Sequence, residues 1–509
     1  MYGGNSDEGL KKVLKTADGG YLYAGNSISF GSSSLPDCYI MKTNAFGSVE
    51  WAKTYGEPGW KDFIDNIIPT SDGGYAFAGT AQEPVTLATK ILFGKIDSAG
   101  NLQYQNSFVY TTWEIAYQII QTSDGGYMIA ADSRVNGSYY DIIMIKLNVS
   151  GGVQWAKAVD GTASYFEFKP VLVHQTPDGG YVVMGSYLDM VTNDQDPLAF
   201  KMDSAGNEVW KYHYQGGNMD YIKAGTYVPN EGYYVVGNNF TSNYDCLLMK
   251  IGFDGSLIWS KTYGTPIPYE EFLAIEYVGD DKLLVSGKAD DDGQQVNIYF
   301  TGLLMDTSGT IVWQKKYTAM SCDVGENGNS VVAADDGGYL FASHGFTGFS
   351  SWNIYSVKTD ASGNSGCSDA PISLSPLIYS LTAAPYTGTF TIPISQSIPV
   401  WITNSGANVT TFCEYIDSVV TDINENILQE EISVYPNPAP EIIHIDSKDK
   451  SIAKIQVVNL LGEEMISMDM NAHRVQVPAV HLSNGIYFLK IHFSDSSILL
   501  KKVQVNRTQ

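Results

Sequence analysis

Apolar and polar residues alternate along most of this chain in short runs, which is the period-two pattern of half-buried β-strands. In one stretch the runs cover roughly residues 114–121, 126–133, 140–147 and 152–159, and turn-forming residues separate them. Val, Ile, Tyr and Trp are frequent within the runs. No segment carries a sustained helical period, so the chain is predicted to be all-β.

The same unit of four strands is repeated along the chain. The string Asp-Gly-Gly-Tyr, or a relative of it, occurs seven times; Gly20 and Gly338 of the first and last copies are 318 residues apart over six intervals, a mean period of 53 residues. Asp-Gly-Gly favours a tight hairpin, because Gly adopts positive φ without a Cβ clash. Seven repeats of four short strands predict a seven-bladed β-propeller with four-stranded blades over residues 1–366.

A large aromatic residue marks the fourth strand of six repeats. Its recurrence at one position predicts packing between neighbouring blades, although a sugar-stacking platform is the alternative. These residues are Trp51, Tyr104, Trp155, Trp210, Trp259 and Trp313.

The two ends of the repeat region depart from the pattern. Cys367 stands where the seventh aromatic residue is expected, and no fourth strand of the usual form follows it. The first residues, MYGG, resemble the tail of a fourth strand, as in KTYGE from Lys53 and KTYGT from Lys261. We therefore expect the N-terminal strand to complete the last blade. We also expect the chain to be truncated at its N-terminus, with part of the closing strand upstream of Met1.

Residues 367–415 differ from the repeats in composition. No charged residue occurs between Ala370 and Cys413, and Ser, Thr, Pro and Ile dominate. This composition predicts extended strands or a covering arm. We expect a disulfide between Cys367 and Cys413 to fix the arm against the last blade, as disulfides do in exported proteins.

The overall charge excludes some classes of function. The formal net charge is −25, and the chain has only three Arg residues, so a nucleic-acid ligand is not expected. No apolar run reaches about 18 residues, so no membrane span is expected. HExxH, GxSxG and CxxC motifs are missing from the sequence, which leaves no residue to assign as catalytic.

Ten residues before the Asp of each hairpin string lies an acidic position. Such a ring of carboxylates either accepts backbone N–H bonds in the loops between blades or lies at the axial mouth. At the mouth it would form a cation or calcium site, or an acidic funnel for basic ligands. In the fourth repeat Phe168 occupies the position and Glu167 precedes it. The acidic ring comprises Glu8, Asp62, Glu114, Glu167, Asp220, Glu270 and Glu326.

A second ring lies five residues after the Tyr of each hairpin string. It stays polar but changes in chemistry from repeat to repeat, and a small residue always precedes it. Variation on a fixed scaffold suits a ligand-binding rim, although tolerance at strand ends explains it equally well. The second ring comprises Asn26, Thr80, Asp132, Ser186, Asn238, Lys288 and His344.

After an acidic linker at 416–431, residues 432–509 alternate again in five to seven short strands, which predict a small Ig-like β-sandwich. Four motifs stand there in order: Tyr435-Pro436-Asn437-Pro438, a turn at Gly462, Gly485 with Tyr487, and Lys501-Lys502. Their order resembles the type A C-terminal sorting domain of the type IX secretion system of Bacteroidetes-like bacteria. The resemblance implies an extracellular or outer-membrane surface protein that the type IX secretion machinery exports.

Taken together, the sequence predicts a secreted binding protein that uses one face of the propeller to bind a glycan or a protein. The alternatives are an extracellular enzyme acting on polysaccharide and a passive structural or adhesive module. An enzyme would need a non-repeating cluster of carboxylates or His, and spacing alone shows none. Calcium is the only cofactor that the sequence suggests.

Overall fold

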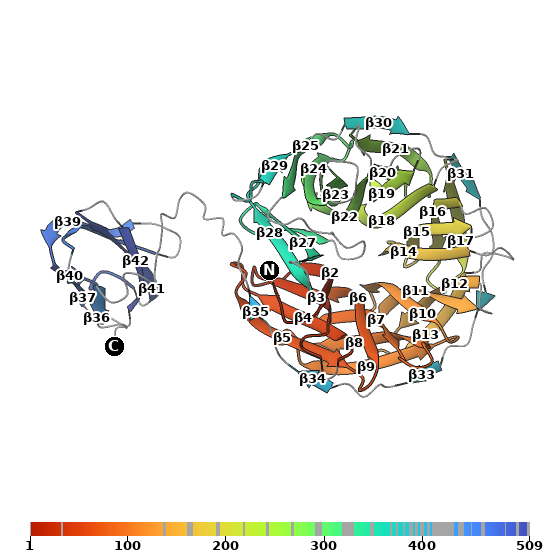
Figure 1. The fold of residues 1–509 in the computed structure, drawn as a ribbon, viewed down its shortest axis with the longest axis horizontal. Helices are drawn as coiled ribbons and strands as arrows, with labels where there is room; N and C mark the ends of the chain where they lie inside the picture. The colour runs from red at the N-terminus through yellow and green to blue at the C-terminus, as the bar shows by residue number, and fades with distance from the viewer. Residues whose placement is uncertain are drawn as a thin grey trace. The chain divides into compact units, whose positions relative to one another are not determined.

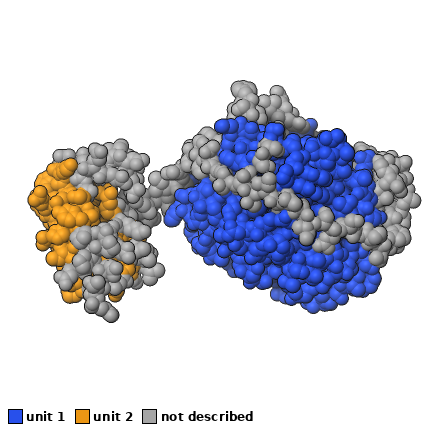
Figure 2. Space-filling view, turned by 90° about the horizontal axis from the view of Figure 1, so that it is seen from below, with its two compact units in different colours: residues 1–415 blue, residues 416–509 orange. Residues whose placement is uncertain are grey.

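The structure is a computed structural model, and Figure 1 shows its fold. It divides into one unit at Met1–Tyr415 and a second at Ile416–Gln509 (Figure 2). The residues that the structure describes are 2–31, 34–135, 139–159, 166–189, 194–216, 219–240, 244–265, 269–290, 298–317, 330–346, 351–366, 369–372, 375–379, 382–385, 390–391, 395–397, 402–404, 408–409, 432–435, 442–448, 450–459, 464–483, 485–494 and 498–505.

The first unit contains seven antiparallel sheets, each built on four strands of one repeat. Sheet one is β2 (Glu8–Lys15), β3 (Tyr21–Ser27), β4 (Asp37–Thr43) and β5 (Val49–Gly56); sheet two is β6 (Lys61–Pro69), β7 (Tyr75–Gln82), β8 (Thr89–Ile96) and β9 (Leu102–Val109). Sheet three is β10 (Glu114–Gln121), β11 (Tyr127–Val135), β12 (Tyr139–Leu147) and β13 (Val153–Val159); sheet four is β14 (Phe166–Gln175), β15 (Tyr181–Asp189), β16 (Asp194–Met202) and β17 (Glu208–Gln215). Sheet five is β18 (Met219–Val228), β19 (Gly232–Phe240), β20 (Tyr244–Ile251) and β21 (Leu257–Gly264); sheet six is β22 (Glu270–Gly279), β23 (Lys282–Asp290), β24 (Ile298–Asp306) and β25 (Ile311–Tyr317).

Sheet seven takes its strands from both ends of the repeat region. Strands β26 (Ser330–Ala333), β27 (Tyr339–Phe346) and β28 (Trp352–Thr359) are joined by β1 (Tyr2–Gly3), which pairs with β28 at Tyr2↔Ile354. The expectation that the N-terminal strand completes the last sheet is confirmed. The first strands of consecutive sheets contact one another in order, and β26 also contacts β2. Figure 1 shows these first strands nearest the middle of the ring.

The uncharged arm contributes a fifth strand to every sheet, which the sequence did not predict. Its strands are β29 (Asp369–Pro371), β30 (Ser375–Tyr379), β31 (Thr382–Pro385), β32 (Phe390–Thr391), β33 (Ser395–Ser397), β34 (Ile402–Asn404) and β35 (Asn408–Val409). They pair in chain order with sheets six, five, four, three, two, one and seven. We call this segment the belt, because it follows the outer edge of the ring (Figure 1). It is therefore not confined to the last blade. Cys367 and Cys413 lie outside the described residues, whereas Cys38 and Cys246 are buried free thiols.

Aromatic side chains of each fourth strand pack on the next sheet. The ring of Trp51 lies 2.8 Å from the point where a Cβ on Gly100 would stand, and Trp313 lies 2.6 Å from the equivalent point on Gly363. Trp155, Trp210 and Trp259 cover glycines of the next sheet in the same way. Each of these glycines has φ near +80°, the left-handed region. The prediction of packing between blades is confirmed for these residues.

A tyrosine four residues after the marker position adds a hydrogen bond between sheets. Its hydroxyl donates to the carbonyl oxygen of the same turn glycine in the next sheet. The pairs are Tyr2–Gly47 (2.8 Å), Tyr55–Gly100 (2.7 Å), Tyr214–Gly255 (2.8 Å), Tyr263–Gly309 (2.6 Å) and Tyr317–Gly363 (3.0 Å). In sheet two the equivalent residue is Phe108, and Asn106 Nδ2 donates to Gly151 O instead, at 2.9 Å.

The second unit contains two antiparallel sheets around one core. One sheet is β36 (Ile432–Tyr435), β37 (Ile442–Ser447) and β40 (Arg474–Pro478); the other is β39 (Glu464–Ala472), β38 (Ile452–Val458), β41 (Gly485–Phe493) and β42 (Ile498–Val505). Ile443 and Val477 from the first sheet share a buried cluster with Leu489 and Ile491 from the second. The two sheets therefore bury their apolar faces against each other.

Candidate binding face

Both predicted rings lie at the same end of the sheets. Five acidic-ring residues lie at the start of a first strand and pair with the residue after the second ring, as in Glu8↔Ser27 and Glu270↔Ala289. They are Glu8, Asp62, Glu114, Asp220 and Glu270. In these five sheets the second-ring residue pairs with the residue after the acid, as in Phe63↔Thr80 and Glu271↔Lys288. We call this the ring end, and the opposite end, with the Asp-Gly-Gly hairpins, the turn end.

The described carboxylates of the acidic ring are buried and bonded to the chain. Gly4 N donates to Glu8 Oε2 at 2.8 Å, and Glu57 N donates to Asp62 Oδ2 at 2.7 Å. Glu114 accepts the backbone N–H groups of Tyr110 and Thr111, and Glu270 accepts that of Thr265 at 3.3 Å. Asp220 accepts a 2.6 Å bond from the side chain of Asn239. These carboxylates therefore accept hydrogen bonds from the chain, while Asp62, Glu114 and Glu270 each keep one buried oxygen without a hydrogen-bond partner.

Burial governs the electrostatics of these acids. Burial raises the pKa of Asp62 to about 7, and the neighbouring charge of Asp37 adds to the rise. Burial likewise raises the pKa of Glu270 to about 7, against the hydrogen bonds from Thr265 and with a contribution from Asp245. The pKa values of Glu8 and Glu114 are also raised by burial. Folding therefore disfavours the charged form of these groups.

The remaining two members of the acidic ring are placed differently. Phe168, not Glu167, pairs with Tyr187 at the ring position of sheet four, and Phe168 is buried. Glu167 pairs one step further along, with Leu188. Glu326 lies outside the described residues.

The second ring is partly buried and holds sheets together. Thr80, Asp132, Ser186 and Asn238 are buried, whereas Asn26, Lys288 and His344 are half-buried. Thr80 Oγ1 accepts the backbone N–H of Ala116 at 3.1 Å, and Ser186 Oγ accepts that of Ile222 at 2.8 Å. Both acceptors bond to the first strand of the next sheet. At these two positions the side chain performs a structural role.

Other second-ring side chains contact the first strand of their own sheet. Tyr117 donates to Asp132 Oδ2 at 3.1 Å, Thr80 donates to Asp65 Oδ2 at 2.8 Å, and Lys288 lies 3.5 Å from Glu271. The imidazole of His344 packs edge-on against Trp352, with centroids 5.3 Å apart. The second ring is thus continuous with side chains of the innermost strands.

A β-bulge in the first strand of each of sheets one to six supplies further inner side chains, which the sequence reasoning missed. A bulge leaves one residue unpaired and redirects its side chain. The unpaired residues in sheets one to six are Lys11, Asp65, Tyr117, Val171, Lys223 and Leu273. The available signal was the break in alternation, for example Lys11-Lys12 within β2.

The inner side chains form a mixed-charge surface that follows no repeat. Lys11 of sheet one lies 3.5 Å from Asp65 of sheet two. Burial raises the pKa of Glu276 in sheet six, and the charges of Lys12 and Lys15 in sheet one oppose that rise. The charges of groups in non-adjacent sheets therefore affect the pKa of Glu276. We call the bulge residues and the second ring together the inner face.

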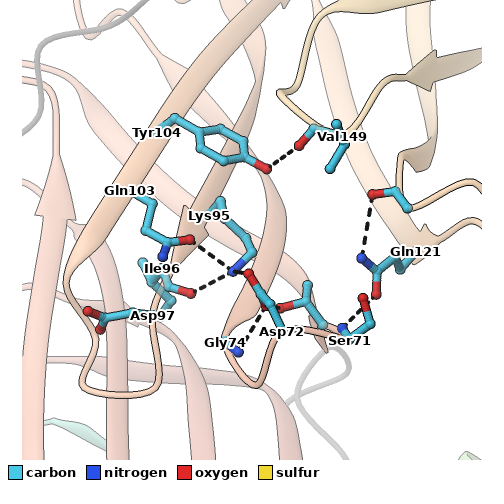
Figure 3. A network of polar contacts seen from close by, with 12 residues as sticks. Ser71, Asp72, Gly74, Lys95, Ile96, Asp97, Gln103, Tyr104, Gln121 and Val149 are labelled. Atoms are coloured by element: carbon cyan, nitrogen blue, oxygen red, sulfur yellow. Dashed lines mark hydrogen bonds and ion pairs between the residues drawn. The ribbon is translucent and has the colours of Figure 1, made fainter.

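The turn end, by contrast, repeats one polar network (Figure 3). In sheet two Asp72 Oδ2 lies 2.9 Å from Lys95 Nζ, while Asp72 Oδ1 accepts bonds from Thr70 Oγ1 at 2.5 Å and Gly74 N at 3.1 Å. The bond from Thr70, assisted by Lys95, lowers the pKa of Asp72 to about 2 although burial opposes the shift. The equivalent pairs are Asp18–Lys42, Asp124–Lys146, Asp178–Lys201, Glu231–Lys250 and Asp336–Lys358. Only sheet six departs, because Leu304 replaces the lysine there.

Within the described residues, no group of three or more His, Cys, Asp or Glu side chains is arranged to hold a metal ion. Nor does the described part of the chain contain a helix long and apolar enough to cross a bilayer.

Comparison with known proteins identifies the C-terminal unit. Residues 433–506 match the family model described as a secretion system C-terminal sorting domain. The C-terminal unit is a type IX sorting domain. Tyr435 lies on β36 of the sorting domain and donates to Asp446 at 2.9 Å, while Gly485, Tyr487, Lys501 and Lys502 lie on β41 and β42. Pro436, Asn437, Pro438 and Gly462 lie outside the described residues. The protein is secreted or displayed at the cell surface.

Solved structures resemble the chain only distantly, and no curated protein matches it. The extracellular domains 1–2 of Drosophila semaphorin 1a are 8% identical, with a TM-score of 0.40, over 70% of this chain and 87% of that one. The extracellular domain of a hybrid two-component system of B. thetaiotaomicron is 11% identical, with a TM-score of 0.21, over 98% of this chain and 74% of that one. A biofilm-associated protein BSP domain is 9% identical, with a TM-score of 0.13, over 100% of this chain and 98% of that one.

Proposed function

We propose that this protein is a secreted or cell-surface binding protein that recognises a glycan or a protein through the inner face of a closed seven-bladed β-propeller. An Ig-like C-terminal domain delivers it to the type IX secretion machinery. Closure is supported by β1, which pairs with β28, and by the contact between β26 and β2. The face-to-face sheets of the C-terminal unit support the Ig-like assignment.

The observation that carries the binding proposal is the contrast between the two ends of the sheets. At the turn end the same Asp–Lys or Glu–Lys pair recurs in six of the seven sheets. At the inner face, equivalent positions hold Lys11, Asp65, Tyr117, Val171 and Lys223. Repetition is what a scaffold needs, whereas a ligand that is not sevenfold symmetric needs different groups around one centre.

The inner face offers chemistry that suits hydroxyl-rich or peptide ligands. Lys223 lies over the ring of Tyr221 at 5.6 Å from its centroid, and both are half-buried. Aromatic faces stack on apolar sugar faces or peptide side chains, while amines and carboxylates bond to hydroxyl and amide groups.

The test is a screen of the whole chain against a glycan array and against extracellular proteins. Tyr117→Ala and Lys223→Ala should each lower the affinity for the captured ligand at least tenfold. Phe46→Ala, at a 93% exposed side chain of the turn end, should leave its affinity unchanged. Turnover of a bound polysaccharide would instead indicate an enzyme. Absence of any ligand, or equal loss in all three variants, would contradict the proposal and favour a passive module.

A further inference from the structure

The same short motif, Tyr-Gly, ends the outermost repeat strand at three junctions between consecutive sheets. It lies at Tyr2-Gly3, Tyr55-Gly56 and Tyr263-Gly264, before sheets one, two and six. At each junction the residue after the glycine donates its backbone N–H to the acidic-ring carboxylate. The bonds are Gly4 N–Glu8 Oε2, Glu57 N–Asp62 Oδ2 and Thr265 N–Glu270 Oε1.

The missing Cβ of the glycine leaves room for a third-strand side chain to reach the acid. Where a Cβ on Gly56 would stand, Asp37 Oδ1 is 2.4 Å away and Asp62 Oδ2 is 3.1 Å away. At Gly264 the equivalent point is 2.3 Å from Asp245 Oδ1. Asp37 and Asp62 therefore form a carboxylate pair across one junction. Asp245 and Glu270 form a second pair across the next such junction, because Asp245 reaches Gly264 as Asp37 reaches Gly56, and the following residue, Thr265, donates its N–H to Glu270 Oε1 at 3.3 Å.

Each pair contains a buried oxygen with no protein partner. Asp62 and Glu270 are both 0% exposed, yet Asp62 Oδ1 and Glu270 Oε2 accept no hydrogen bond from the chain. A buried carboxylate oxygen without a donor costs free energy, and a second carboxylate beside it adds repulsion. Two separate junctions share this arrangement, so it is a feature of the fold rather than of one loop.

The third junction shows what happens when the second carboxylate is replaced. Asn353 stands in place of Asp37 and Asp245, and its Oδ1 lies 1.6 Å from the point where a Cβ on Gly3 would stand. Glu8 Oε2 lies 2.8 Å from that point. Here both oxygens of Glu8 accept hydrogen bonds, from Gly4 N and from Ser27 Oγ at 3.0 Å. At this junction, with a neutral amide as partner, no oxygen of the acid is left over. Glu114 Oε2 of the same ring is also buried without a hydrogen-bond partner, but no second carboxylate has been identified beside it among the described residues.

We propose that a Ca²⁺ ion binds between Asp37 and Asp62 and a second between Asp245 and Glu270, each joining two consecutive sheets. Ca²⁺ takes six to eight oxygen ligands at about 2.3–2.6 Å, so two oxygens of one ion lie within about 5 Å of each other. The distances at Gly56 allow this separation. Backbone carbonyls and water would complete each shell, which Ca²⁺ tolerates better than Mg²⁺ does.

Neighbouring charges distinguish the two sites. At the first site Glu57 adds a third carboxylate to the field of Asp62, and Lys90 contacts Glu57 and opposes that field. At the second site Tyr244 and Tyr269 flank the pair in sequence, and their rings stack with centroids 5.4 Å apart. Both sites therefore have aromatic rings nearby that can transfer excitation energy to a bound lanthanide. At the first site Tyr55 precedes Gly56, and Lys90 lies 4.0 Å from the centroid of the Trp60 ring.

The experiment titrates the whole chain with Tb³⁺, which takes the ligands of Ca²⁺ and emits when a nearby tyrosine is excited. Two ions per chain should bind, Ca²⁺ should displace both, and Ca²⁺ should raise the Tm relative to EDTA. Glu270→Gln and Asp62→Asn should each leave one ion and lower the sensitised emission in part. The chain that carries both substitutions should bind none.

The junction with Asn353 provides the matched control. Glu8→Gln removes an equally buried carboxylate of the same ring and should still bind two ions. Circular dichroism in EDTA checks that each variant is folded, and Asp245→Asn, at a less buried site, tests the second ion independently. Absence of Ca²⁺-displaceable emission, or an equal loss in Glu8→Gln, would overturn the proposal. In that case the two carboxylates of each pair share a proton instead.

Discussion

A phenol hydroxyl donates to a turn glycine of the next sheet at five junctions of the ring. We expect Tyr263→Phe to lower the free energy of unfolding by about 1–2 kcal/mol, because the carbonyl of Gly309 loses a 2.6 Å bond in a buried setting. Urea unfolding of the whole chain measures the change. Phe108→Tyr is the control and should bring no gain, because Asn106 already donates to Gly151 in that sheet. Equal stability of Tyr263→Phe and the parent would show that the bond contributes nothing.

The buried acid Asp62 should make stability depend on pH. Its pKa rises from the ordinary value of 3.8 to about 7 in the folded protein. The folded protein therefore keeps a proton that the unfolded chain releases. This contribution is fully present below pH about 4 and is lost as the pH rises through about 7, a change of up to about 4 kcal/mol.

Asp62→Asn should flatten that slope between pH 4.5 and 8, measured by urea unfolding in EDTA. Asp203→Asn, at an exposed turn, should keep the parental slope, since the hydrogen bonds from Asn207 lower its pKa and it is charged throughout this range. If Asp62→Asn keeps the parental pH dependence, the buried acid is not the group that titrates.

At the scale of elements, the belt covers the outer edge of every sheet. An exposed edge strand is a template for aggregation, so seven covered edges protect the ring from self-association. Neighbouring residues of an antiparallel edge alternate between hydrogen-bonded and non-hydrogen-bonded pairs. Of Leu377→Pro and Ile378→Pro in β30, one should therefore remove a ladder bond to β21 and the other should not.

Hydrogen exchange measured by mass spectrometry checks this. One of the two variants should lose protection across Leu257–Gly264, whereas β20 in the same sheet stays protected in both. Equal exchange in both variants and the parent would indicate that β30 does not hold that edge in solution.

The repeat made most of these elements predictable, and the belt shows where prediction stopped. Asp-Gly-Gly turns and alternating apolar residues depend on local chemistry, so the four strands of each repeat could be placed from the sequence. Pairing of β29–β35 depends on edges contributed by residues up to about four hundred positions away. The uncharged composition indicated extended chain but carried no information about its partners.

The candidate site was predictable only in part, for a related reason. The ring positions were visible because the repeat aligns them, but strand alternation gives no register for a bulged residue. Lys11, Asp65 and Tyr117 therefore escaped notice. The sequence also could not show that the hydroxyl oxygens of Thr80 and Ser186 accept backbone N–H groups from the next sheet. Both residues were therefore interpreted as part of a binding rim.

At the scale of the whole molecule, ring and sorting domain are separate compact units with separate tasks. The last belt strand that the structure describes, β35, ends at Val409 and pairs with β1, so this strand precedes the linker. We therefore expect a chain ending at Tyr415 to fold but to remain in the periplasm when it is expressed in a type IX-competent host behind a signal peptide. In this expectation, export depends on the sorting domain. Folding of the ring does not depend on it.

Cell fractionation and far-UV circular dichroism of the recovered protein measure the two parts of this expectation. Attaching residues 416–509 to an unrelated periplasmic protein should move that protein to the cell surface. This result would show that the sorting domain directs export independently of the ring. If the chain ending at Tyr415 still reached the surface, the ring itself would carry an export signal. If it were found unfolded, the sorting domain would support the ring, and the two units would not be independent.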